Sequence, residues 1–232
     1  MNHSVRTQNI GTLNKKEFPN SDIFTSMKVP PALISIFNKH LPPSSVSYCA
    51  LLWEEIPFHF HVKAPRTSKL GDFRYRKDQK IQTITLNSDL NPYQFLLTYI
   101  HEVAHLRTFE KYGLSHSPHG KEWKKEFQQL LAPILVDSIF PRDILVPLRI
   151  HMQNPSASSA KDLFLMKEMS KYDLDVKDST EKFLADLPSG QAFILQGRKF
   201  TKKETRRTRV MCEEVGTGRK FLVSKLAKVT PA

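Results

Sequence analysis

The chain has 232 residues, of which 40% are hydrophobic and 25% charged, and its net charge is +12. This balance is typical of globular proteins and excludes wholesale disorder and collagen-like or coiled-coil repeats. No apolar run approaches the roughly 18–20 residues that cross a bilayer, and the N-terminal segment lacks the apolar stretch of a secretory signal. Two cysteines, Cys49 and Cys212, are too few for a disulfide framework or a four-thiolate metal site. We therefore expect a cytoplasmic protein without a membrane partner.

Helices and strands alternate in the first part of the chain. Residues 1–27 are polar and aperiodic, which indicates a flexible arm. Apolar residues at helical spacing predict a helix over residues 30–41, between two Pro-Pro pairs. Residues 58–62, 73–76 and 80–86 alternate as strands do, and a turn at residues 69–72 suggests that the first two form a hairpin.

The clearest predicted helix begins at Asn91, a good N-cap, with Pro92 in the first helical position. Its wide apolar surface places it deep in the fold, and Gly113 ends it. A second amphipathic helix is expected over residues 121–131. Pro133, Pro141 and Pro147 should interrupt the residues that follow.

The small polar residues 154–160 indicate a linker, followed by a short helix near residues 162–172. Strands are expected at residues 192–195, 208–214 and 220–223, with a turn at residues 216–218. The sequence thus predicts an α+β fold in four parts: an arm (1–27), a main domain (28–152), a linker with a short helix (153–187) and a β-rich module (188–232). In the main domain, a small sheet should pack on helices.

The β-rich module is strongly basic. Residues 188–232 contain eleven Lys and Arg residues and three acids, and so carry +8 of the net charge. Such a segment attracts polyanions, nucleic acid above all, although it could also be only a solubilising surface. The residues expected to contact a phosphate backbone are Lys202, Lys203, Arg206, Arg207 and Arg209, with Arg207 and Arg209 on one face of a strand.

The sequence His101-Glu102-Val103-Ala104-His105 lies within the long predicted helix. Two histidines four residues apart share one helical face, so both imidazoles can reach one metal ion. Glu102 lies beside the metal position, where a carboxylate can take a proton from a water molecule. This pattern indicates a catalytic zinc site rather than two core histidines.

A catalytic zinc site has three protein ligands and an open position, so a third ligand must follow. His119 precedes the next helix and is held at a defined angle, which favours it. His116 lies inside the loop and is an alternative. Glu122 or Glu126 of the second helix would be a different solution, as in zinc peptidases with a downstream glutamate ligand.

The sequence His101-Glu102-x-x-His105, followed by His119-Gly120-x-x-Trp123, resembles the SprT-like zinc metallopeptidases, which are related to the Spartan proteases. The similarity spans about residues 30–150. It implies a minimal zincin-like domain with His101, His105 and His119 as ligands of one Zn²⁺ ion and Glu102 as the catalytic acid/base. Members of this family act on proteins, and the eukaryotic relatives cleave proteins crosslinked to DNA.

The chain departs from this family near its C-terminus. Many relatives carry a zinc ribbon with two Cys-x-x-Cys pairs, whereas here only Cys212 remains. One thiolate cannot hold a structural zinc, so we expect a single metal ion in the whole chain. The module should then be held by packing against the main domain, through Phe193, Leu195, Phe200, Val210, Phe221 and Leu222.

Two functions from different classes follow. The first is a zinc endopeptidase that a basic module brings to nucleic-acid-bound protein substrates. The second is a nucleic-acid-associated binding protein whose zinc site is structural or vestigial. The residue that stabilises an oxyanion is left open among Arg74, Tyr75, Tyr112 and His116. Simpler structural roles are expected for five further residues: His59, His61, Cys49, Trp53 and Trp123.

Overall fold

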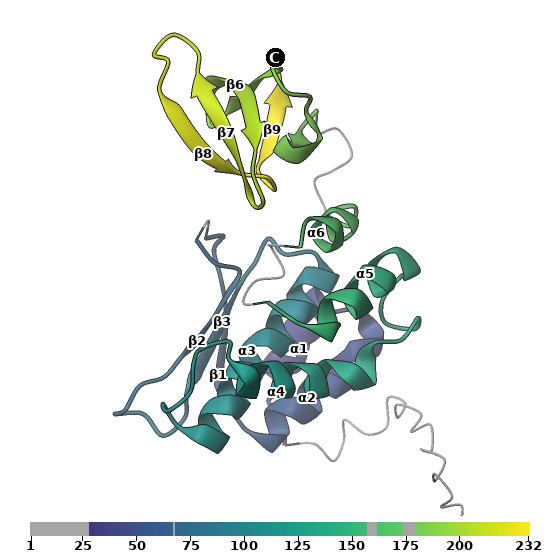
Figure 1. Cartoon of the computed structure of the whole chain (residues 1–232). Coiled ribbons are helices and arrows are strands. Elements are labelled where there is room, and N and C mark those ends of the chain that lie inside the picture. The colour runs from purple at the N-terminus through teal and green to yellow at the C-terminus, as the bar shows by residue number, and fades with distance from the viewer. Residues whose placement is uncertain (1–27, 67, 157–161, 174–179) are drawn as a thin grey trace, which may run out of the picture.

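The computed structural model describes residues 28–66, 68–156, 162–173 and 180–232. Helices and a small sheet form one region, and a β-rich module follows it in the chain (Figure 1). The predicted mixture of α and β elements is therefore confirmed. The expected N-terminal arm lies outside the described residues, and the domain boundaries stay predictions.

Within the described residues, the helical region combines six helices with a three-stranded sheet. Its elements are α1 (Pro31–His40), α2 (Val46–Glu55), β1 (His59–Lys63), β2 (Gly71–Arg74), β3 (Thr83–Asn87), α3 (Pro92–Tyr112), α4 (Lys121–Leu131), α5 (Arg142–Gln153) and α6 (Leu163–Ser170), with short 3₁₀ turns at Pro43–Ser45 and Ala132–Ile134. The α2 helix was not predicted, because its short apolar run has no decisive periodicity. Among the described residues, no helix is both long enough and apolar enough to span a bilayer.

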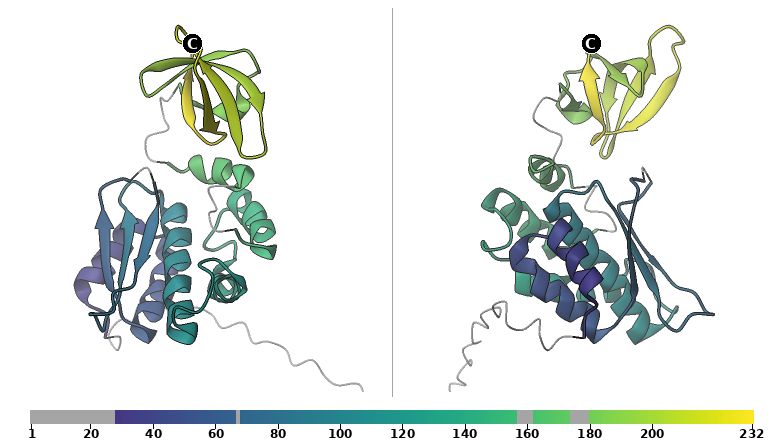
Figure 2. Two further views of the ribbon diagram at one scale, coloured as in Figure 1. Left: turned by 60° about the vertical axis from the view of Figure 1, so that its left-hand side comes forward. Right: turned by 180° about the vertical axis from the view of Figure 1, so that it is seen from behind.

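The sheet has the order β1-β3-β2, with β1 parallel and β2 antiparallel to β3. The expected hairpin between β1 and β2 is therefore wrong, since each pairs with β3 instead. The central strand β3 is buried on both faces, with Ile84 and Leu86 fully enclosed. Helix α3 packs against β2 and β3, and it runs alongside the sheet in Figure 2.

Helix α3 begins and ends as its sequence predicts. The side-chain oxygen of Asn91 accepts hydrogen bonds from the backbone N–H groups of Tyr93 (3.1 Å) and Gln94 (3.0 Å). Gly113 ends the helix with a φ of 64°, a conformation that glycine adopts without strain. Eleven of the 21 residues of α3 are buried, so the helix forms the centre of the fold.

The residues after α4 contain one departure from expectation, at Pro147. Pro147 lies inside α5 and does not interrupt it, because Ile144 and Leu148 bury their side chains around it and only one helical hydrogen bond is lost. The short helix expected near residues 162–172 is present as α6, which packs on α5 and buries Leu165 and Met169 in the main core.

The C-terminal module is a six-stranded sheet of order β4-β9-β5-β6-β7-β8. Its strands are β4 (Lys182–Phe183), β5 (Ala192–Leu195), β6 (Arg198–Thr205), β7 (Arg209–Glu214), β8 (Lys220–Ser224) and β9 (Lys228–Pro231). Its buried apolar residues form a cluster of their own around Phe193, Phe200 and Val210, with Leu195 and Phe221 packed against it. Five of the six residues expected to hold the module therefore pack together, but with one another and not with the main core. Leu222 is 48% exposed and does not belong to that core.

Candidate metal centre

Three histidine side chains converge on one point. His101 and His105 lie four residues apart on α3, and His119 comes from the loop before α4. Their Nε2 atoms are 3.2 Å apart for His101 and His105, 2.9 Å for His105 and His119, and 3.2 Å for His101 and His119. Among the described residues, this trio is the group of His, Cys, Asp or Glu side chains that could hold a metal ion.

The donor set fits zinc. Burial and the neighbouring imidazoles lower the pKa of His101, and the same causes lower the pKa of His105 to about 3, so both rings are neutral at pH 7. Zn–N bonds of 2.0–2.1 Å in a tetrahedral site place ligand nitrogens about 3.3 Å apart, close to the observed separations. The Nε2 atoms of the three rings face one another, and a bound cation would accept their lone pairs.

The indole ring of Trp123 packs against the imidazole rings of all three histidines. Its ring centroid lies 4.6 Å from that of His101, 5.3 Å from His105 and 4.7 Å from His119. The indole is fully buried, and its N–H donates to the His101 carbonyl (3.4 Å). Trp123 was expected only to fill the core, but it also packs against the three imidazoles. The sequence signal for this contact is the position of Trp123 four residues after His119.

Glu102 lies beside the trio but not within it. Only 6% of its surface is exposed, and its carboxylate accepts a hydrogen bond from the Phe73 N–H of β2. Burial raises the pKa of Glu102 to about 8, although the Phe73 hydrogen bond opposes this shift. Gly71 approaches so closely that a Cβ atom there would lie 2.7 Å from Glu102 Oε1. Only glycine permits this contact.

The three histidines and Glu102 line a cleft of about 560 Å³. The other walls come from the chain around β2 (residues 68–73), from α3, and from the loop before α4. Apolar side chains, including Phe73, Phe109 and Leu114, line this cleft together with charged ones such as Lys69 and Asp72. β2 is an edge strand, so one side of its backbone pairs with no other strand among the described residues.

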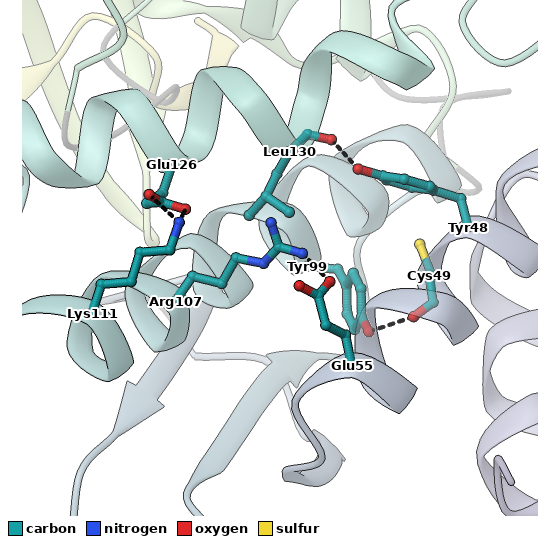
Figure 3. A network of polar contacts seen from close by, with 8 residues as sticks. All are labelled: Tyr48, Cys49, Glu55, Tyr99, Arg107, Lys111, Glu126 and Leu130. Carbon is teal, nitrogen blue, oxygen red and sulfur yellow. Dashed lines mark hydrogen bonds and ion pairs between the residues drawn. The ribbon is translucent and has the colours of Figure 1, made fainter.

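The alternatives for the third ligand lie elsewhere. Both carboxylate oxygens of Glu126 accept from Lys111 Nζ, at 2.7 and 2.8 Å, which ties α4 to α3 (Figure 3). Glu122 lies 3.7 Å from Lys121 Nζ and is outside the group. His116 lines the cleft without joining the trio.

Other candidates take the simpler roles. His59 and His61 are exposed on β1, and Trp53 donates from its indole N–H to the Phe58 carbonyl (2.8 Å). Cys49 is fully buried, which raises the pKa of its thiol.

Of the four candidates for oxyanion stabilisation, only His116 lines the cleft. Tyr75 packs on Phe109 instead, with ring centroids 4.6 Å apart. Arg74 lies 3.6 Å from Asp72 in an ion pair, and Tyr112 is 43% exposed.

Lys202 does not belong to the expected basic patch. Its side chain is buried, with 4% exposed, and its ammonium donates to the carbonyls of Leu184 (2.9 Å), Ala185 (3.1 Å) and Leu187 (2.6 Å). An ammonium group held in this way is not free to contact a phosphate. The reason is structural: the 3₁₀ turn after β4 presents its carbonyls to β6.

The remaining basic residues are exposed at one end of the β6–β7 hairpin. Arg206 and Arg207 lie in the connection between the strands, and Arg209 opens β7, so Arg207 and Arg209 do not share one face of a strand as expected. Lys203 lies 3.6 Å from Glu213, and Arg206 lies 3.7 Å from Glu204. These exposed pairs are screened by solvent and leave the tip positive overall.

The fold and the site together define a small α+β domain with a candidate metal centre on its central helix. Comparison with protein families identifies the segment: residues 51–136 match the model of the SprT-like family. The match runs from within α2 to just beyond α4 and contains all three histidines and Glu102, so the expected resemblance is confirmed for this segment. No curated protein and no solved structure matches the chain.

Proposed function

We propose that this protein is a zinc-dependent metallopeptidase that hydrolyses peptide bonds. The observation that carries the proposal is the convergence of three imidazoles beside a separate, buried carboxylate in one cleft. A purely structural metal site has no need of such a carboxylate. The match to the SprT-like family supports the same conclusion.

Zinc bound by three imidazoles would lower the pKa of a water molecule and polarise a peptide carbonyl. Glu102 accepts the proton of the attacking water at its carboxylate and then delivers that proton to the leaving amine. Burial raises the pKa of Glu102 to about 8 in the metal-free protein. Bound zinc would lower that pKa towards pH 7, because a nearby dication favours the ionised carboxylate that accepts the proton. The Phe73 N–H holds the carboxylate in place, and Trp123 holds the imidazoles.

The cleft suits an extended peptide. A substrate strand could pair with the outer edge of β2 at backbone groups other than the Phe73 N–H, and these hydrogen bonds would hold it along the cleft. Phe73, Phe109 and Leu114 would receive apolar side chains of the substrate.

We further propose that the substrates are proteins associated with nucleic acid in the cytoplasm. Lys203, Arg206, Arg207 and Arg209 remain exposed and supply a polyanion-binding surface on the module. This surface would hold a phosphate backbone without reading its sequence, because phosphate contacts fix position but carry no base information.

The basic module also supports the second candidate function, a nucleic-acid-associated binding protein with a non-catalytic metal site. One experiment separates the two. Zinc content is measured on the purified chain, and cleavage of a DNA-binding protein is followed with and without DNA. One zinc per chain and cleavage that a chelator and the Glu102→Gln substitution both abolish would support the peptidase. Zinc without cleavage under any condition would support the binding protein.

A further inference from the structure

Asn87 is a buried polar residue with no part in the chemistry above. It lies at the end of β3 with 1% of its surface exposed. Its Nδ2 donates to the carbonyls of Arg66 (3.1 Å) and Lys69 (2.9 Å), and its Oδ1 accepts from Arg66 Nε (2.7 Å). Its backbone N–H donates to the Leu70 carbonyl (2.9 Å). The side chain and backbone of one residue therefore hold the described residues that lead into β2.

Arg66 strengthens this attachment. Its Nη1 donates to Thr85 Oγ1 (3.2 Å), so the guanidinium bridges two residues of β3. Lys69, whose carbonyl Asn87 holds, lies 2.8 Å from Asp72 in an ion pair. Through Asn87 and Arg66, the chain before β2 is thus fixed to the central strand β3.

The segment held in this way continues directly into the wall around Glu102. Gly71 follows Leu70, and its Cα lies so close to Glu102 that any side chain would collide with the carboxylate. Two residues later, the Phe73 N–H donates to the same carboxylate. A small shift of the chain before β2 would therefore change the position of the Phe73 N–H relative to the Glu102 carboxylate.

We propose that Asn87 is a positioning residue for Glu102: it holds the entry to β2 so that the Phe73 N–H stays on the Glu102 carboxylate. The catalytic part of this inference rests on the proposed peptidase function. The structural part does not, because the Phe73 hydrogen bond can be measured in an inactive protein.

Two substitutions test the inference. Asn87→Asp keeps the shape and the acceptor for Arg66 but removes both Nδ2 donors, and Asn87→Ser is a second, smaller variant in case the first does not fold. The control is Tyr48→Phe, which removes the part-buried hydrogen bond from Tyr48 on α2 to the Leu130 carbonyl of α4 (2.6 Å; Figure 3). It matches the loss of a side-chain hydrogen bond to a backbone carbonyl, at residues that do not line the cleft.

The first readout is hydrogen exchange of the Phe73 amide by NMR. We expect exchange at least tenfold faster in the Asn87 variants than in Tyr48→Phe. The second is cleavage, with kcat expected to fall at least tenfold while KM and the zinc content stay within twofold. Unchanged Phe73 exchange, or an unchanged kcat in a protein that cleaves, would overturn the inference. A wild-type protein that cleaves nothing would refute the peptidase proposal alone, and the exchange of Phe73 would still decide the role of Asn87.

Discussion

Replacing Glu102 by glutamine should stabilise the metal-free protein while abolishing catalysis. The pKa of the buried carboxyl is raised from 4.5 to about 8. Between these values the folded protein holds the proton and the unfolded chain does not, so stability is fully present below pH 4.5 and is lost as the pH rises towards 8. At pH 7, which is 2.5 units above the unfolded pKa, the loss amounts to about 3 kcal/mol as an upper value. A glutamine side chain is neutral at both pH values and therefore avoids this loss of stability.

The assay is urea unfolding of the chelator-treated protein at pH 5 and pH 7, followed by tryptophan fluorescence. We expect Glu102→Gln to exceed the wild type in free energy of unfolding by about 3 kcal/mol at pH 7 and by less than about 1 kcal/mol at pH 5. Glu110→Gln, an exposed position on the same helix, is the control for the change in charge. With zinc bound the difference should shrink, because a nearby dication favours the ionised carboxylate.

A variant that is no more stable than the wild type at pH 7, or a difference that does not grow with pH, would refute this reasoning. It would mean that Glu102 is well solvated or already paired with a cation. Its proposed part in proton transfer would then lack the environment that we assign to it.

Three further predictions concern other positions. Gly71→Ala should lower kcat at least tenfold and leave the zinc content unchanged, since the new Cβ displaces the Glu102 carboxylate; a fully active variant would contradict this contact. His119→Ala should reduce zinc affinity at least a hundredfold and His116→Ala less than threefold, as measured by chelator competition, and equal losses would refute the assignment. Lys202→Met should destabilise the module by about 1–3 kcal/mol in thermal unfolding, because it leaves the buried carbonyls of Leu184 and Leu187 without this hydrogen-bond donor. Lys203→Met, at an exposed neighbouring position, should change stability little, and similar losses for both would contradict the burial of Lys202.

Local sequence signals predicted the parts of the fold that depend on local chemistry. The bounds of α3 follow from the side-chain cap of Asn91 and from the positive φ of Gly113, both of which involve neighbouring residues only. The pairing of β1 with β3 could not be predicted in the same way, because the alternation of a strand does not identify its partner.

The candidate metal centre also has one part that neighbouring residues predict and one part that they do not. The spacing of His101 and His105 fixes their common helical face, so two of the three histidines of the metal centre can be predicted from a five-residue segment. The neighbours of Glu102 cannot be predicted from local sequence, because Gly71 and Phe73 come from a strand about thirty residues earlier.

The burial of Lys202 could not be predicted from neighbouring residues either. Its charge suggested a phosphate ligand, but a turn fifteen or more residues away supplies three carbonyls that bury it.

The most direct measurement is a crystal structure of the zinc-bound protein, with the metal located by anomalous scattering at the zinc edge. We expect one zinc peak per chain, bonded to Nε2 of His101, His105 and His119, with both Glu102 oxygens outside the coordination sphere. A peak bonded to the Glu102 carboxylate, or no peak at the three histidines, would contradict the account.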